Sequence, residues 1–114
     1  MSIPAKYNIT HYQGDTFIVA IALEGNLTTT TPKFEIKLPN ATSATLELLS
    51  GSGITIQAYD AASNTTTFAI AISAAQSTTL GYADVYWYDF ELLNGAVVTT
   101  YLAGSFTQPQ QVSV

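Results

Sequence analysis

The acidic side chains in the last third of the chain come closest, by type and spacing, to a reactive site. Asp89 and Glu91 lie two positions apart, so in a strand they project from the same face, and Asp84 is nearby. Such oxygen ligands could form a weak Ca²⁺ site, but no loop of alternating acidic ligands accompanies them. A glycosidase pair needs environments that push two pKa values apart, which neighbouring strand positions rarely provide. The sequence therefore predicts neither a metal site nor a catalytic carboxylate pair.

His11 is the single histidine of the chain, and its surroundings supply no catalytic partner. Its neighbours Tyr12, Gln13 and Gly14 include no nucleophile, and no serine lies in a Gly-x-Ser-x-Gly turn. A triad needs both a nucleophile and an orienting residue. The absence of cysteine also excludes disulfides and thiolate metal sites. We expect a protein that is not an enzyme and that holds no cofactor.

Trp87 and the tyrosines around it raise sugar binding as a second kind of chemistry, because an aromatic face offers apolar contact beside polar edges. Tyr82 and Tyr101 could join it. Tyr86 and Tyr88 alternate with Trp87, however, and so point to the opposite face of a strand. A glycan-binding module that uses Trp87 as an exposed aromatic contact stays open as an alternative.

Charged residues are scarce throughout the sequence. Three lysines and eight carboxylates are about 10% of the 114 residues, with no arginine, where roughly 25% is usual. The net charge of −5 opposes binding to phosphate backbones, so we predict no nucleic-acid partner. A chain this poor in charge is more readily covered by neighbouring proteins than by water. Assembly with other proteins is therefore the first functional expectation.

The length of the chain and its first residues predict how it is organised and where it is made. A chain of this size can bury one core, so we expect one β-sandwich domain over residues 1–114. Residues 1–6 lack the features of a signal peptide, and no stretch approaches the ~20 apolar residues of a membrane helix. We expect synthesis in the cytoplasm without export, and no membrane partner.

Short runs of alternating apolar and polar residues, separated by glycine, proline, asparagine and serine, predict an all-β fold. Their spacing favours a single Ig-like antiparallel β-sandwich of about seven to nine strands. Ser73 and Gln76 have the spacing of a capping box, which predicts one short helical turn within residues 73–80. The predicted strands cover residues 17–23, 33–38, 45–49, 54–58, 66–72, 83–93 and 96–101.

Two of these strands show which side chains should form the core. Asn94-Gly95 predicts a type I′ turn between residues 83–93 and 96–101, because both residues tolerate positive φ. In the strand over residues 33–38 one face is apolar and the other is wet or salt-bridged. The side chains predicted to be buried in these two strands are Phe34, Ile36, Leu38, Tyr86, Tyr88, Phe90 and Leu92.

The predicted strands over residues 17–23 and 66–72 are apolar on both faces. Small or aliphatic residues lie behind the core-facing ones, and the sequence allows two interpretations. Either the strands are central in a sheet or covered by a loop, or their second face is a protein interface, since obligate contacts resemble a divided core. The candidate interface residues are Ile18, Ala20, Ala22, Ala69 and Ala71.

The order of short motifs along the chain resembles that of a family of viral structural proteins. These motifs are Tyr7-Asn8-Ile9-Thr10, Gln13-Gly14-Asp15-Thr16-Phe17, Tyr88-Asp89-Phe90-Glu91-Leu92, Gly104-Ser105-Phe106-Thr107 and a final Val112. The pattern looks like that of small β-sandwich virion proteins of tailed bacteriophages, and is similar to the N-terminal domain of upper baseplate proteins. The chain lacks the terminal Val-Thr-Arg of that family and the fibre or receptor-binding region that follows in longer members.

The resemblance implies a non-enzymatic structural protein located in the virion, with other virion proteins as partners and several copies related by symmetry. The first hypothesis is an adaptor that attaches to the tail, baseplate or neck and holds a fibre or a neighbouring component. The alternative within the same particle is a decoration protein on the capsid surface. A glycan-binding adsorption module that uses Trp87 is the alternative from a different class.

Overall fold

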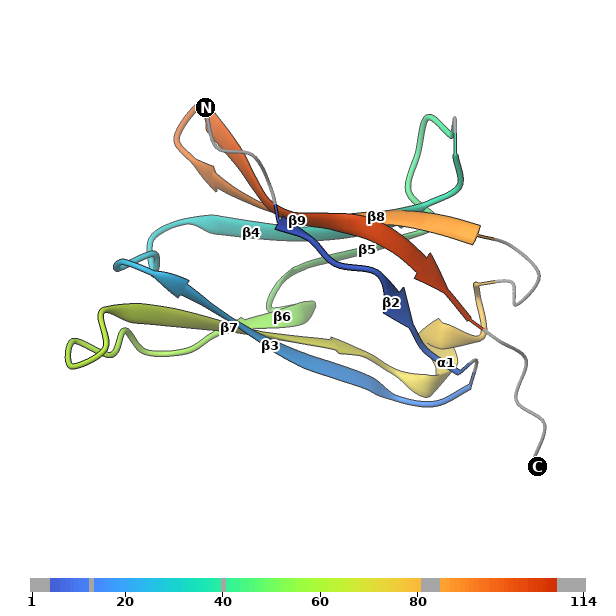
Figure 1. Cartoon of the computed structure of the whole chain (residues 1–114), viewed down its shortest axis with the longest axis horizontal. Helices are drawn as coiled ribbons and strands as arrows, with labels where there is room; N and C mark the ends of the chain where they lie inside the picture. Colours follow the sequence, from blue (N-terminus) through green and yellow to red (C-terminus); the bar gives the residue numbers. More distant parts are fainter. Residues whose placement is uncertain (1–4, 13, 40, 81–84, 109–114) are drawn as a thin grey trace.

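A computed structural model describes residues 5–12, 14–39, 41–80 and 85–108 of the chain (Figure 1). These residues form nine strands and one helix of a single turn, which confirms the predicted all-β fold. The elements are β1 (Ala5–Lys6), β2 (Ile9–Thr10), β3 (Phe17–Glu24), β4 (Thr31–Lys37), β5 (Leu46–Ser50), β6 (Gly53–Ile56), β7 (Thr65–Ile72), α1 (Ala74–Ser77), β8 (Val85–Asn94) and β9 (Val97–Thr107).

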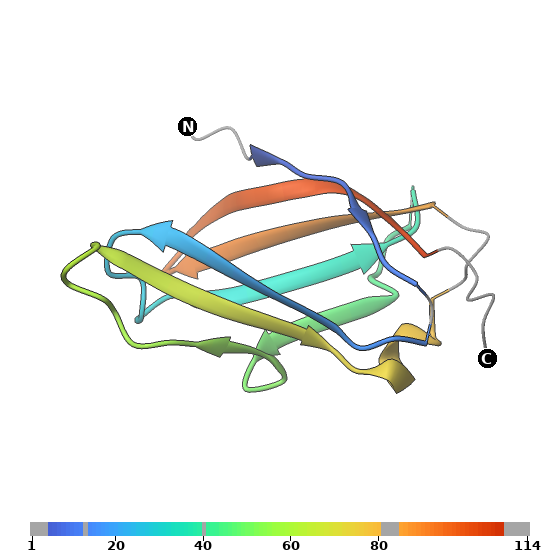
Figure 2. The ribbon, with the colours of Figure 1, turned by 60° about the horizontal axis from the view of Figure 1, so that its bottom comes forward.

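The strands form one hydrogen-bonded sheet that curls over itself. Their order is β1-β9-β8-β4-β5-β6-β7-β3, and β2 also pairs with β9. Figures 1 and 2 show β9, β8 and β4 in one layer and β6, β7 and β3 in a facing layer, while the chain passes from one to the other between β5 and β6. Pairing is mixed, because β1 and β2 run parallel to β9 and β5 runs parallel to β6. No pair within the described ranges joins β3 to β1 or β2, so the sheet is open along that side.

The core lies between the two layers. Phe68 of β7 meets Phe90 of β8 edge to face at 5.5 Å, and Phe17 of β3 meets Phe106 of β9 at 5.9 Å. The predicted core face of β8 is confirmed, since its side chains are buried. The fully or nearly fully buried apolar side chains are Phe34, Ile36, Leu48, Ile54, Phe68, Ile70, Ile72, Leu80, Tyr86, Tyr88, Phe90, Leu92 and Phe106.

Leu38 is a correction to the predicted core. β4 ends at Lys37, and the carbonyl of Leu38 accepts a hydrogen bond from the N–H of Ala41 at 3.1 Å. The chain therefore turns away from the sheet at this residue, and the Leu38 side chain is 38% exposed.

The hairpin between β8 and β9 is present, but its turn is displaced by one residue from the prediction. Asn94 is paired with Val97, so the two central residues are Gly95 and Ala96. Gly95 has φ of 62°, and the one non-glycine residue with positive φ in the described part of the chain is Asn64. Positive φ at the first central position alone is the pattern of a type II′ turn, so the predicted type I′ turn at Asn94-Gly95 is wrong. A register shift beside Phe90 adjusts the rest of β9 to β8.

The short helix α1 forms where the capping box predicts it. Ser73 Oγ accepts from the N–H of Gln76 at 3.1 Å, and Gln76 Oε1 accepts from the N–H of Ser73 at 3.0 Å. The turn places the hydroxyl of Ser77 against Gln108 Oε1 at 2.8 Å, where it also accepts from the N–H of Gly14 at 3.0 Å. These buried contacts tie the start of β3 to the end of β9 and close one end of the core.

Candidate protein-binding edge and face

The five candidate interface residues lie together on one surface. β3 pairs with β7 along its whole length, with Ile18 opposite Ala71 and Ala20 opposite Ala69. Ile18 is 73% exposed, Ala20, Ala22 and Ala71 are also exposed, and Ala69 is half-buried. We call this surface the alanine face. Four of its five side chains are alanines, the fifth is the larger Ile18, and none of the five is charged.

β3 lies at an edge of the sheet, and this excludes the interpretation that it is a central strand. Within the described residues its single strand partner is β7. The N–H of Gly25 donates to the carbonyl of Asn64 at 2.8 Å, so the pair formed by these two residues is hydrogen-bonded. Because hydrogen-bonded pairs alternate in an antiparallel ladder, the backbone N–H and C=O groups of Ile18, Ala20 and Ala22 point away from β7. The residues of the alanine face in β3 thus also carry the outward-directed backbone groups of the edge.

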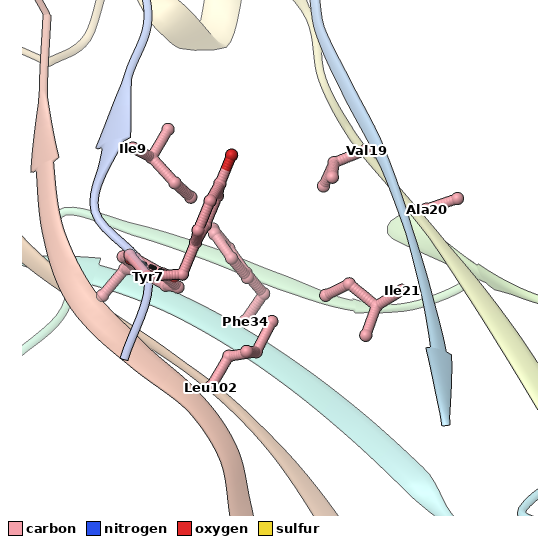
Figure 3. Close-up of a pocket in the computed structure, with 8 residues that line it drawn as sticks. Tyr7, Ile9, Val19, Ala20, Ile21, Phe34 and Leu102 are labelled. Atoms are coloured by element: carbon pink, nitrogen blue, oxygen red, sulfur yellow. Dashed lines mark hydrogen bonds between the residues drawn. The ribbon is translucent and has the colours of Figure 1, made fainter. Parts of the chain in front are cut away.

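A cavity of about 280 Å³ opens beside this edge, between β3 on one side and Tyr7, β2 and β9 on the other. Figure 3 shows Val19 and Ile21 directed into this gap from β3, while Ala20 points away from it. We call this region the open seam. Its lining is predominantly apolar and consists of Tyr7, Ile9, Val19, Ala20, Ile21, Phe34, Tyr88 and Leu102.

The far wall of the open seam is held by Tyr88 and by the close approach of two backbones. The Tyr88 hydroxyl donates to the carbonyl of Tyr7 at 2.5 Å, and its ring stacks on Phe34 at 5.3 Å. Burial, followed by the influence of Tyr7, raises the pKa of Tyr88 to about 12. The N–H of Tyr7 donates to the carbonyl of Ala103 at 3.0 Å. A side chain at Gly104 would collide with the carbonyl of Tyr7, so glycine allows β1 and β2 to lie against β9.

Of the carboxylates considered for chemistry, Glu91 forms an ion pair with Lys33, which also pairs with Glu35. Lys33 Nζ lies 2.7 Å from Glu35 Oε1 and 3.3 Å from Glu91 Oε1, which confirms the salt-bridged second face of β4. Hydrogen bonds to these two carboxylates raise the pKa of Lys33. Asp89 lies directly opposite Glu35, and Asp84 lies outside the described residues. Within the described part of the chain, no group of three His, Asp or Glu side chains is arranged to hold a metal ion.

Asp89 lies beside these ion pairs without joining them, and burial disfavours its charged form. Its Oδ1 atom is buried and has no hydrogen-bond partner. Desolvation is the main cause that raises the pKa of Asp89, and the charges of Glu91 and Glu35 add to it. The ionised form of this side chain therefore costs stability in the folded protein.

Asp89→Asn is expected to stabilise the protein at neutral pH. The raised pKa means that the folded state binds the proton more tightly than the unfolded state, so stability falls as pH rises from about 3.8 through the raised value and stays lower above it. We expect a gain of roughly 0.5–1 kcal/mol at pH 7, limited by partial solvent screening. Urea unfolding at pH 7 and near pH 3 measures it, and the gain should vanish at the lower pH. As a control, Glu91→Gln weakens the pairing of Lys33 and should not increase the free energy of unfolding. If Asp89→Asn increased the free energy of unfolding equally at both pH values, the electrostatic cause would be contradicted.

His11 lies beside the start of β3 and is used for packing. Its ring is buried, meets Phe17 edge to face at 5.2 Å, and places Nε2 2.8 Å from the carbonyl oxygen of Asp15. These contacts hold the loop that leads from β2 into β3.

Trp87 lies on the outer face of β8, and its side chain is 47% exposed. Tyr86 and Tyr88 are buried on the opposite face, and Tyr101 is half-buried on β9. Tyr82 lies outside the described residues. The structure thus leaves Trp87 as the accessible ring among the described members of the predicted cluster.

No protein-family model and no curated protein matches this chain. Within the described residues no helix is long and apolar enough to span a membrane. The open seam and the edge position of β3 were not predicted from the sequence. The one signal for them was the apolar character of both faces of residues 17–23, which indicated contact but not its kind.

Proposed function

We propose that this chain is a non-enzymatic structural protein of a tailed-bacteriophage virion, an adaptor that attaches to the tail, baseplate or neck and holds a fibre or another component. The alanine face carries the proposal, since it is an uncharged apolar surface that includes Ile18, which is 73% exposed. Small side chains allow another protein to approach the sheet closely, and their burial removes apolar surface from water. The motif order described above supplies the link to phage particles.

The composition of the chain supports the same proposal. Symmetric assemblies bury several faces of each subunit, which reduces the need for charge on the surface. With 11 charged residues in 114, this chain suits a position in which neighbouring virion proteins cover much of it. Within the proposal, partners are other virion proteins in multiple copies, and the location is the virion.

Ala71→Glu tests the alanine face, because it places an unpaired charge in the contact without touching the free edge of β3. Virions assembled with this variant as the sole copy should contain at least tenfold less of the protein, measured by quantitative immunoblotting of purified particles. Thr29→Glu, at an exposed turn position away from this face, is the control and should be incorporated normally. Incorporation of folded Ala71→Glu at the unmodified level would reject the alanine face as the contact.

Antibody labelling of purified particles, viewed by electron microscopy, separates the alternatives within the virion. Label at the tail, baseplate or neck supports the adaptor, and label over the head supports a capsid decoration protein instead. The exposure of Trp87 favours a glycan-binding adsorption module as the remaining candidate. Retention of the purified protein on immobilised glycans would support that candidate.

A further inference from the structure

We propose that the chain forms a twofold-symmetric dimer in which β3 pairs antiparallel with β3 of a second copy. This inference goes beyond the proposed function, because it holds for whatever larger assembly the dimer enters. It rests on the backbone of the edge, on the incomplete burial of the core beside it, and on the side chains that would meet across the axis.

The edge of β3 is long, regular and apolar. All eight residues from Phe17 to Glu24 are paired one to one with β7, with no bulge. Edge strands in natural sheets are usually kept from pairing by lysine, proline, bulges or short length. β3 has none of these, and its single charged residue, Glu24, lies at its end. Such an edge exposes a row of backbone groups that an additional strand would satisfy.

The opposite edge of the same sheet provides a contrast. This edge is formed by β1 and β2, each of two residues within the described part of the chain, and β1 includes Lys6. Both properties are among those that protect an edge from pairing. The two ends of the sheet thus differ in the way expected if β3 alone is used for assembly.

The core is also incomplete at β3. The inward side chains of β3, including Val19 and Ile21, are half-buried and border the open seam of about 280 Å³. Their cross-strand partners on β7, including Phe68 and Ile70, are fully buried. A strand added to β3 would cover the open flank of Val19 and Ile21 with its own inward side chains, because inward and outward positions alternate in register across a sheet.

A second copy of β3 meets these requirements. Even-numbered residues of β3 carry the outward backbone groups, and in antiparallel pairing they must face even-numbered residues of the added strand. A twofold axis through Ala20 or through Ile21 satisfies this condition. Either arrangement lays apolar inward side chains against each other. On the outward side Ala20 lies opposite Ala20 or Ala22, the larger Ile18 lies opposite Ala22 or Glu24, and the two Glu24 side chains lie at opposite ends of the contact. Like charges therefore do not meet along β3.

The symmetry of this contact also limits its size. Pairing of β3 with itself is isologous, so it uses the edge of each copy once and closes as a dimer. Pairing of β3 with the edge formed by β1 and β2 of another copy would be open-ended, and these two-residue strands offer a shorter ladder than β3 does. The structure therefore favours a closed dimer over a filament.

Ala20→Pro is the matched test of the edge. The N–H of Ala20 points away from β7, so proline removes a donor that the β3–β7 ladder does not use, while it blocks an added strand. Sedimentation velocity of the full chain over a wide concentration range should show a monomer–dimer equilibrium. Ala20→Pro should weaken dimerisation at least tenfold and keep the circular dichroism spectrum of the unmodified protein. Ala20→Ser, which retains the N–H, should dimerise like the unmodified protein.

Hydrogen exchange on the unmodified protein keeps the test independent of whether Ala20→Pro folds. The amides of Ile18, Ala20 and Ala22 should exchange more slowly as protein concentration rises through the dimerisation range. Three results would each overturn the proposal. The unmodified protein could remain monomeric at every concentration, folded Ala20→Pro could dimerise as well as the unmodified protein, or the protection of these amides could be independent of concentration. A monomer whose β3 pairs only with an extended segment of another protein is among those overturning outcomes. The two proposals can fail independently. Purified Ala71→Glu should still dimerise through β3 even when it is not incorporated into virions, because Ala71 lies on β7 and not on the free edge.

Discussion

Replacing Phe68 with alanine is expected to destabilise the protein by about 3–5 kcal/mol, which is enough to unfold many domains of this size. Phe68 is fully buried on β7 and meets Phe90 of β8 edge to face at 5.5 Å, so its ring joins the two layers of the curled sheet. Truncation loses the transfer free energy of the ring and leaves a cavity between layers whose other side chains are fixed by their strands. Chemical denaturation followed by the fluorescence of the single tryptophan measures the change.

Val97→Ala is the control for this experiment. Val97 is 64% exposed at the start of β9, and a surface truncation of this kind should change stability by less than about 0.5 kcal/mol. A loss for Phe68→Ala as small as that for Val97→Ala would show that the two layers do not share one packed core.

Gly104→Ala is expected to cost about 2–3 kcal/mol and to release β1 from the sheet. The added methyl group would overlap the Tyr7 carbonyl oxygen and lie 2.9 Å from the carbonyl carbon. These are backbone atoms, which cannot rotate away as a side chain can. Relief requires Tyr7 to move, which breaks its N–H bond to Ala103 and the hydrogen bond that it accepts from Tyr88. Denaturation measures the loss of stability, and hydrogen exchange at Tyr7 measures the release.

Ser105→Ala serves as the matched control on the neighbouring residue of β9. Its backbone N–H still donates to Asn8 Oδ1, so the attachment of the N-terminal strands is retained. If Gly104→Ala keeps both the stability and the Tyr7 protection of the Ser105→Ala variant, the close approach of the two backbones does not position this wall of the open seam.

The alternation of apolar and polar residues was sufficient to predict most strands and the core face of β8. That face is readable because Tyr86, Tyr88, Phe90 and Leu92 occur at every second position, and a strand has only two faces. The capping box of Ser73 and Gln76 was readable for a similar reason, since both of its hydrogen bonds are local. Features determined by near neighbours in the sequence could thus be predicted from the sequence.

Features determined by the pairing of distant segments could not be predicted from the sequence. The two-residue strands β1 and β2 are too short to show a period, and their parallel attachment depends on the lack of a side chain at Gly104. The edge position of β3 follows from the order of the whole sheet, so residues 17–23 alone allow a central strand equally well. The hairpin turn was displaced because the β8–β9 register is fixed by the pairing of whole strands, including the shift beside Phe90, and not by the Asn94-Gly95 pair alone.

The pairing of β1 and β2 with β9 has a consequence for the order in which the protein is completed during translation. Thr10 and Thr107, whose hydroxyls lie 3.5 Å apart, are separated by 97 residues. β1 and β2 are synthesised before β9 and therefore wait without their partner until nearly all the described chain has followed them, and closing so long a loop comes late in folding. During that interval the apolar side chains of the open seam lack the wall that Tyr7 and Ile9 provide.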